Sequence, residues 1–315
     1  MNPYKEEIAV IGAGLMGCGI AQVFAVAGHR VSLFDPSPEA RRAADGRLAA
    51  VLADLGLDRP AGSVVVRAEI EPAVEVAEFV VEAGPERLEI KQEIFAELDR
   101  LAPSKAILAT NTSAIPIMEI ADVVRDKGRV VGSHFWNPPH LVSLVEVIEA
   151  RLTTTEVVDD ALSLLRRSGM KAVHVRADIP GFIGNRLQHA LKREAIALVA
   201  AGHCSAETLD EVVKEGFGAR LATVGPLEQS DLVGLDLTLD IHRVLMPSLD
   251  RTDVPHPYLV SKVEAGETGA AVGRGFRDWP PGTADAARRR VRAALIERHK
   301  GQIEPESRTD RRERG

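Results

Sequence analysis

The chain has 315 residues, of which 45% are hydrophobic and 27% charged, as is typical of a soluble protein with room for two domains. The formal net charge of −7 disfavours a partner dominated by nucleic-acid phosphates, and the 4% of aromatic residues disfavours a base-stacking surface. The two cysteines form neither a disulfide framework nor a metal cluster, so we expect no metal site.

No targeting segment is evident in the sequence. The polar N-terminus runs directly into a predicted strand and does not resemble a signal peptide. No apolar run approaches the roughly 18 residues that a membrane span requires. We therefore expect a cytoplasmic protein with no membrane or nucleic-acid partner.

Short aliphatic segments alternate with helical patterns over about the first 175 residues. The predicted strands are Ile8–Ile11, Val31–Phe34, Val64–Arg67, Phe79–Glu82, Ala106–Thr110, Val130–His134, Leu144–Ile148 and Ala172–Val175. Between them, helical spacing is clearest in Gly14–Gly28, Glu86–Leu101 and Glu156–Ser168. This alternation predicts an α/β Rossmann domain, a doubly wound and mostly parallel sheet with helices on both faces.

The pattern changes at Asp178-Ile179-Pro180-Gly181, after which strand signals cease and an all-α C-terminal domain is expected. The helices predicted there are Phe182–Ala201, Ala206–Glu215 and Asp236–Leu249. The predicted division is a Rossmann domain at 1–178, a helical domain at 179–300, and a charged, disordered tail at 301–315. A basic binding arm is the alternative for this tail, although acidic residues interleave its arginines.

A glycine-rich motif joins the first predicted strand to the first predicted helix. Its sequence is Gly12-Ala13-Gly14-Leu15-Met16-Gly17. Gly12 permits a tight turn, Gly14 lets a pyrophosphate approach the backbone, and Gly17 lets helix and strand pack closely. Leu15 and Met16 open the helix, whose unpaired N–H groups attract phosphate. An ordinary turn, or another adenine nucleotide, remains the alternative.

An acidic residue, Asp35, follows the second predicted strand about 20 residues after the glycine motif. A carboxylate at this place binds the hydroxyls of the adenosine ribose and repels a 2′-phosphate. The predicted cofactor is therefore NAD rather than NADP.

Polar residues occur at the ends of two later strands and inside a third. Asn111-Thr112-Ser113 follows one strand, His134 closes the next, and Glu146 lies inside the aliphatic strand Leu144–Ile148. Burial of a lone carboxylate is costly, so Glu146 needs a partner, and a histidine is the partner with a chemical use. The sequence therefore predicts a His134–Glu146 acid–base pair. Taken singly, any of the nine histidines could be structural, and Glu146 could face water from an edge strand.

These motifs resemble the L-3-hydroxyacyl-CoA dehydrogenase family over nearly the whole chain. The resemblance is carried by GAGLMG at Gly12–Gly17, VEAGPERLEIK at Val81–Lys91, ATNTS at Ala109–Ser113, HFWNP at His134–Pro138, LVEVI at Leu144–Ile148, PGFIGNR at Pro180–Arg186, and the helical-domain residues Gly225-Pro226 and Asp231–Asp236. It implies hydride transfer to NAD in a homodimer that forms through the helical domain.

The resemblance also implies roles for individual residues. His134 is the expected general base, Glu146 orients it, and Ser113 and Asn185 donate hydrogen bonds near the substrate oxygen. The residues expected to approach the cofactor, besides the glycine motif and Asp35, are Glu86, Lys91, Asn111 and Asn137.

The chain departs from the acyl-CoA members in ways that point to a smaller substrate. Those members carry a long lysine-bearing hairpin, whereas Ala40–Ser63 is short and contains no lysine. Asn137-Pro138-Pro139-His140 and Arg193-Glu194-Ala195 are more similar to the branch that oxidises small free acids, such as 5-formyl-3-hydroxy-2-methylpyridine 4-carboxylate 5-dehydrogenase. Asn185, His189 and Lys192 share one helix face, so His189 and Lys192 are candidate substrate residues unless they are merely solvated. His140, in the loop that follows His134, is a further candidate substrate residue.

We therefore expect an oxidoreductase that oxidises a small anionic hydroxy acid with NAD. One alternative is a true L-3-hydroxyacyl-CoA (3-hydroxybutyryl-CoA) dehydrogenase. A second is a non-catalytic NAD-binding protein similar to a lens crystallin. A third is a lysine-dependent β-hydroxyacid dehydrogenase, in which Lys192 rather than His134 would be essential.

Overall fold

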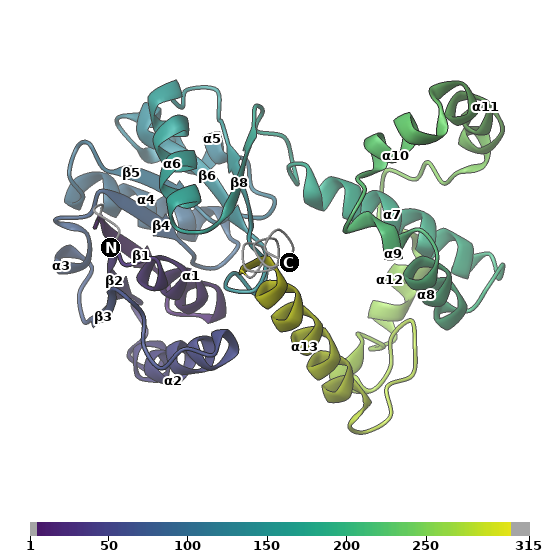
Figure 1. Ribbon diagram of the computed structural model, residues 1–315, viewed down its shortest axis with the longest axis horizontal. Coiled ribbons are helices and arrows are strands. Elements are labelled where there is room, and N and C mark those ends of the chain that lie inside the picture. The colour runs from purple at the N-terminus through teal and green to yellow at the C-terminus, as the bar shows by residue number, and fades with distance from the viewer. Residues whose placement is uncertain (1–4, 304–315) are drawn as a thin grey trace, which may run out of the picture. The chain divides into compact units, whose positions relative to one another are not determined.

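The computed structural model describes residues 5–303 (Figure 1). Contacts divide the chain into two compact units. The first comprises Met1–Asn185 together with Arg292–Gly315, and the second comprises Arg186–Val291. The division falls within two helices, because each of them begins in one unit and ends in the other.

The first unit is built on one sheet of eight strands in the order β3-β2-β1-β4-β5-β6-β7-β8. Their bounds are β1 Glu7–Ile11, β2 Arg30–Phe34, β3 Ser63–Arg67, β4 Phe79–Glu82, β5 Ile107–Thr110, β6 Val130–Phe135, β7 Leu144–Ile148 and β8 Lys171–Val175. All neighbouring strands are parallel except β6 and β7. The eight predicted strands are confirmed, each within one residue at either end.

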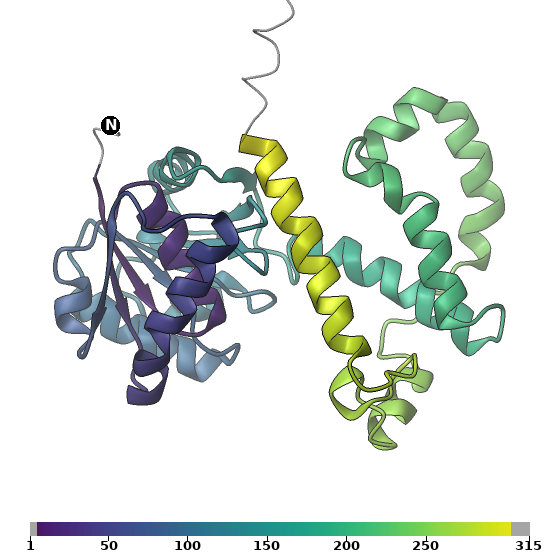
Figure 2. The same cartoon turned by 60° about the horizontal axis from the view of Figure 1, so that its bottom comes forward.

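Helices cover both faces of this sheet because each central strand is apolar on both sides. Ile8 and Val10 of β1 face α1 (Leu15–Val26), α2 (Pro38–Leu55) and α6 (Thr155–Arg167). Figure 2 shows α1 and α2 together over the first face. The opposite core, which includes Ala9 and Ile11, packs against α3 (Glu71–Val74), α4 (Leu88–Leu101) and α5 (Ile117–Ile120). The α/β fold class is therefore confirmed. The strand order reverses between β1 and β4, where ligands bind in such sheets.

Helix α2 is a single helix that covers most of the short segment between β2 and β3. Ser37 caps its first turn by accepting the Ala40 N–H at 3.2 Å, and Gly56 ends it in the left-handed conformation. Only Ala44, Leu48 and Val51 are buried, so a weak apolar stripe explains why the sequence pattern did not reveal this helix.

The second unit is helical. Its main helices are α7 Gly184–Ala200, α8 Ala206–Glu215, α9 Gly218–Leu221, α10 Pro226–Val233, α11 Leu235–Leu245, α12 Pro257–Glu264 and α13 Thr283–Ile303, with α7 beginning and α13 ending in the first unit. The helix predicted at 236–249 is shorter than expected, because Pro247 lies in a 3₁₀ turn, Met246–Ser248, that follows α11. Within the described residues, this unit has isolated bridges but no strand.

Apolar residues of α10 and α11 lie on the surface of the second unit. Leu227, Leu232, Leu235 and Val244 are 63–79% exposed. None of the helices α7 to α12 contains a buried residue. A single copy of this unit therefore leaves a large apolar area in water.

The C-terminal residues differ in part from the expected tail. Gly301–Ile303 form the end of α13, and the remainder of the predicted tail, residues 304–315, lies outside the described residues. Between residues 5 and 303, no helix is both long and apolar enough to cross a membrane.

Candidate active site

The glycine motif forms a turn whose geometry explains all three glycines. Gly12 has a φ of +113°, and a Cβ there would lie 2.6 Å from the Ala83 carbonyl oxygen. A Cβ on Gly17 would lie 1.7 Å from the Gly12 carbonyl oxygen. Gly14, by contrast, has no atom within 4 Å of its Cβ position, so the backbone is open to a ligand on that side.

The first turn of α1 is suited to bind phosphate. Gly14 is its N-cap and supplies no side-chain hydrogen bond, so the first amides of the helix lack the usual cap. Leu15, the first helical residue, is 76% exposed. Open backbone at Gly14 together with uncapped amides fits the pyrophosphate of a dinucleotide.

Asp35 follows β2 and lies beside the glycine motif. Its Oδ2 accepts the Ala13 N–H at 2.8 Å, and its Oδ1 accepts the Ser37 N–H at 2.9 Å. These two bonds fix the carboxylate at the place where an adenosine ribose would lie if pyrophosphate occupied the turn.

His134 and Glu146 form a buried pair across β6 and β7. The distance from His134 Nδ1 to Glu146 Oε2 is 2.8 Å, and the side chains are only 6% and 3% exposed. Glu146 Oε1 accepts the N–H groups of Ile183 and Gly184, each at 3.1 Å. Burial by itself would raise the pKa of Glu146, but the bonds from His134 and these amides outweigh it and hold the pKa below its ordinary value.

Two aromatic rings hold the imidazole of His134. The ring centroids of Trp136 and Phe182 lie 5.5 and 5.6 Å from its centroid. Gly184 is required beside them, because a Cβ there would lie 2.2 Å from Trp136 Cζ2. Trp136 belongs to the HFWNP motif, and Phe182 and Gly184 belong to the PGFIGNR motif, but none of the three was predicted to lie in the site.

Two predicted residues, Asn111 and Ser113, follow β5, and a third, Asn185 of α7, contacts Ser113. Asn111 Oδ1 accepts the Phe135 N–H at 2.9 Å, which ties this segment to the strand that bears His134. Asn185 Nδ2 donates to the carbonyl oxygen of Ser113 at 3.1 Å. The structure thus gathers Asn111, Ser113 and Asn185 at the carboxyl ends of β5 and β6.

Glu86 and Lys91 also lie at this end of the sheet, but with different exposure. The side chain of Glu86 is 41% exposed, whereas that of Lys91 is completely buried and contacts Glu82. Lys91 therefore has no exposed surface, and its Nζ lies 3.7 Å from Glu86 Oε2. Glu82 was not among the predicted site residues, although the motif at Val81–Lys91 contains it.

Asn137 and His140 line a hollow of about 470 Å³, which also contains Leu15 and Arg292. His140 Nε2 lies 3.1 Å from Asp54 Oδ2, and its side chain is 8% exposed. The contact with Asp54 gives the imidazole of His140 a polar partner within the protein.

His189 and Lys192 lie on α7 in the second unit, four and seven residues after Asn185. Lys192 lines a mostly apolar hollow of about 410 Å³ with Ile196 and Trp279, and its Nζ lies 3.5 Å from Gln188 Oε1.

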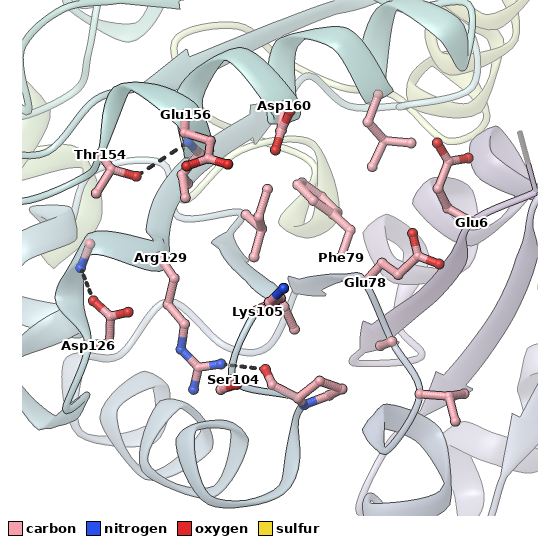
Figure 3. Close-up of a pocket in the computed structure, with 18 of the residues that line it drawn as sticks. Glu6, Glu78, Phe79, Ser104, Lys105, Asp126, Arg129, Thr154, Glu156 and Asp160 are labelled. Atoms are coloured by element: carbon pink, nitrogen blue, oxygen red, sulfur yellow. Dashed lines mark hydrogen bonds between the residues drawn. The ribbon is translucent and has the colours of Figure 1, made fainter.

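A wider hollow of about 770 Å³ lies at the other edge of the sheet, where β4, β5 and β6 begin (Figure 3). Carboxylates such as Glu78 and Asp160 line it together with the cations of Lys105 and Arg129. It is thus remote from the carboxyl ends of the strands. Within residues 5–303, no cluster of three or more His, Cys, Asp or Glu side chains could hold a metal ion.

A Rossmann sheet with an open glycine turn, an acid beside that turn and a buried His–Glu pair is the arrangement of a pyridine-nucleotide dehydrogenase. Sequence comparison gives the family. The profile of the 3-hydroxyacyl-CoA dehydrogenase NAD-binding domain matches residues 7–179, and that of the family's C-terminal domain matches residues 181–279. The chain belongs to the 3-hydroxyacyl-CoA dehydrogenase family.

Two curated relatives and one solved structure illustrate the similarity. The chain is 41% identical over 288 residues to a probable 3-hydroxybutyryl-CoA dehydrogenase of Bacillus subtilis, covering 89% of this chain and 99% of the relative. It is 35% identical over 282 residues to 5-formyl-3-hydroxy-2-methylpyridine 4-carboxylate 5-dehydrogenase of Mesorhizobium japonicum, covering 88% of this chain and 91% of the relative. Among solved structures, a crystal structure of a 5-formyl-3-hydroxy-2-methylpyridine 4-carboxylic acid 5-dehydrogenase, which is described as an NAD⁺-dependent dismutase, matches with a TM-score of 0.88 at 33% identity. The match covers 93% of this chain and 97% of the other.

These similarities confirm the predicted family, the NAD cofactor and the assignment as a dehydrogenase that acts on a hydroxyl group. They include both CoA-ester and free-acid enzymes, so the substrate is a separate question.

Proposed function

We propose that the protein oxidises a small, negatively charged hydroxy acid, with His134 as the general base. The buried 2.8 Å contact between His134 Nδ1 and Glu146 Oε2 carries this proposal. Glu146 engages Nδ1, which leaves Nε2 to take the proton of the substrate hydroxyl. The carboxylate then stabilises the imidazolium that forms.

The polar groups beside His134 fit the substrate oxygen. Ser113 is exposed at the end of β5, and Asn185 lies against its backbone. We assign both side chains as hydrogen-bond donors to the oxygen of the reacting carbon. They would hold that carbon in position while its proton leaves to His134.

NAD, when bound, supplies the hydride acceptor. We propose that Gly12, Gly14, Leu15, Met16 and Gly17 hold its pyrophosphate through their backbone and that Asp35 binds the adenosine ribose. On the same proposal, Asn111, Asn137 and Glu86 border its nicotinamide end, and Lys91 acts through Glu86.

The contacts of α2 support a substrate smaller than an acyl-CoA. The helix contains no lysine. Arg41 donates to the carbonyl oxygen of Asp35 at 2.6 Å, and Arg47 donates to that of Ala13 at 2.8 Å. Two of its arginines are thus engaged with backbone rather than presented to a nucleotide phosphate. We propose that Lys192, on the same face of α7 as Asn185 and His189, attracts the substrate's charge.

A 3-hydroxybutyryl-CoA substrate is the second candidate, and the 41% identity to the Bacillus subtilis relative favours it. An NAD-reduction screen decides between the two. It should compare 3-hydroxybutyryl-CoA, free 3-hydroxybutyrate, carnitine and hydroxymethylpyridine carboxylates, with His134→Ala as the control. A free acid should give the highest kcat/KM. If none of these compounds is oxidised, the result would favour a non-catalytic NAD-binding protein.

We also propose a homodimer. The exposed apolar residues of α10 and α11, which include Leu232 and Val244, support it. A second copy would remove this area from water, whereas a monomer would leave it solvated.

A further inference from the structure

A buried ion pair lies beneath the segment that bears Ser113, and proton transfer does not use it. Glu82 ends β4, and Lys91 lies in α4. Both side chains have no exposed surface, and Lys91 Nζ lies 2.9 Å from each carboxylate oxygen of Glu82. Apolar residues at such places are often as stable or more stable, so folding alone is a weak reason for two buried charges.

Hydrogen bonds from two neighbouring elements fix the carboxylate of Glu82. Its Oε1 accepts the Gly84 N–H at 2.6 Å, and its Oε2 accepts the hydroxyl of Thr110 at 2.7 Å. Thr110 is the last residue of β5. Glu82 therefore connects the carboxyl ends of β4 and β5, and it holds Lys91 at a defined place between them.

Lys91 also contacts a second carboxylate, because its Nζ lies 3.7 Å from Glu86 Oε2. The other oxygen of Glu86 accepts three hydrogen bonds from the next segment. These come from the Thr112 hydroxyl at 2.6 Å, the Ser113 N–H at 2.9 Å and the Ala114 N–H at 3.0 Å. Partial burial would raise the pKa of Glu86, but these bonds and the charge of Lys91 hold it below its ordinary value.

Residues 112–114, which we name the substrate loop, are held from two sides. Glu86 binds the N–H of Ser113, and the Asn185 amide binds its carbonyl oxygen at 3.1 Å. A displacement of Glu86 would therefore move the Ser113 hydroxyl and loosen the contact of Asn185.

We propose that Glu82 and Lys91 are positioning residues for the reaction. The ammonium of Lys91, fixed by Glu82, holds Glu86 in place, so that Glu86 clamps the substrate loop. The loop in turn aims Ser113 and Asn185 at the substrate oxygen. This inference rests on the proposed function, because it takes the roles of Ser113 and Asn185 from it.

The test removes both buried charges while keeping the side-chain shapes, in the double variant Glu82→Gln/Lys91→Met. A second buried pair in the same unit provides the matched control. Arg129 Nη2 lies 2.8 Å from Asp99 Oδ1, with side chains 6% and 8% exposed. Arg129 lines the hollow at the opposite edge of the sheet (Figure 3), so Asp99→Asn/Arg129→Met should lower stability and leave kcat unchanged.

Three measurements separate positioning from stability or direct cofactor contact. The kinetic probe is the ketone that wild type reduces fastest with NADH among acetoacetyl-CoA, acetoacetate and 3-dehydrocarnitine. In Glu82→Gln/Lys91→Met, kcat should fall at least about 10-fold, because a small misplacement of reacting groups is costly. The Kd for NADH should rise by no more than about 3-fold, because Glu86 is only one of several residues proposed to approach the cofactor. Amide exchange of the substrate loop should accelerate, while that of β4 and β5 stays protected.

The proposal is overturned if the double variant folds and keeps kcat and KM within about 2-fold of wild type. It is equally overturned if the Kd for NADH rises as much as kcat falls, since Lys91 would then act on the cofactor. If the double variant does not fold, Glu86→Gln tests the last link at a partly exposed position. Unchanged exchange at Ser113 and Ala114 in that variant would also refute the clamp.

The His134→Ala variant, measured in parallel, keeps the two proposals distinguishable. Full activity of His134→Ala would refute the proposed function. An inactive His134→Ala beside a fully active Glu82→Gln/Lys91→Met would refute the positioning network alone.

Discussion

His134 and Glu146 are directly opposite each other in the antiparallel register of β6 and β7. This pairing brings His134 Nδ1 to 2.8 Å from Glu146 Oε2, although twelve residues separate the two along the chain. The remaining strand pairs of the sheet are parallel, so the His134–Glu146 contact lies at the one antiparallel pairing of this sheet. The orientation of the imidazole thus depends on how the sheet is assembled.

His134→Ala should lower kcat by about 10²–10⁴, the usual contribution of a general base. Glu146→Gln should also be severe, because it removes the charge that stabilises the imidazolium while preserving the shape. NAD affinity should survive both changes. His174 and Glu149 are a second, half-exposed pair at 2.8 Å, so His174→Ala and Glu149→Gln are matched controls that should keep full activity. Near-normal kcat in His134→Ala would disprove the assignment.

The lowered pKa of Glu146 predicts how stability depends on pH. Because the folded-state pKa lies below the ordinary value of 4.5, ionised Glu146 stabilises the fold fully above about pH 4.5. That contribution is lost as the pH falls through the folded-state pKa. Urea unfolding between pH 3 and 7 should therefore show a difference between wild type and Glu146→Gln that shrinks on acidification. A difference that grows towards low pH would contradict this.

Asp35 should make the enzyme prefer NAD over NADP by at least ~10-fold in kcat/KM, or about 1.4 kcal/mol. Its carboxylate, fixed by the Ala13 and Ser37 amides, would repel a 2′-phosphate. Asp35→Ser should narrow the preference, whereas Asp45→Asn on α2 should not. Steady-state kinetics with both cofactors provide the test, and equal kcat/KM values in wild type would refute this role.

Light scattering at micromolar concentration should give twice the chain mass of 33.9 kDa. Val244→Glu, at a residue 75% exposed on α11, should weaken the dimer because it places a charge in the proposed interface. Val76→Glu is the control, since Val76 is 60% exposed in the first unit and should leave the mass unchanged. A monomeric wild type would exclude the dimer.

Lys192→Met should raise KM for the true substrate more than it lowers kcat, because a distant charge contributes to binding throughout the reaction. Lys214→Met on α8 is the control and should change neither parameter. Efficient reduction of acetoacetyl-CoA with NADH, at kcat/KM above ~10⁵ M⁻¹s⁻¹, would instead favour the CoA-ester candidate. An unchanged KM in Lys192→Met would remove that residue from the substrate site.

The glycine turn and the His134–Glu146 contact were both predicted, the first from local chemistry and the second from the cost of burying a lone carboxylate. Position 12 requires a positive φ, and position 17 has no room for a Cβ, so both require glycine. The glycine motif therefore predicts this turn from the sequence alone. His140 shows the limit of such reasoning. It follows β6 and was predicted to contact substrate, and its Nε2 lies 3.1 Å from Asp54 Oδ2, 86 residues earlier, a neighbour that the sequence did not predict. No local pattern signals a partner at that distance.

The eight strands, the glycine turn and the acid that follows β2 were predicted from local patterns, because apolar runs and glycine sterics act over a few residues. The assembled fold was needed for the features that depend on burial and strand pairing. It set Glu146 against His134, buried Lys91 between Glu82 and Glu86, and left the apolar faces of α10 and α11 in solvent. The physical reason is that a buried charge is tolerated only beside its partner, and only the assembled fold brings the two together.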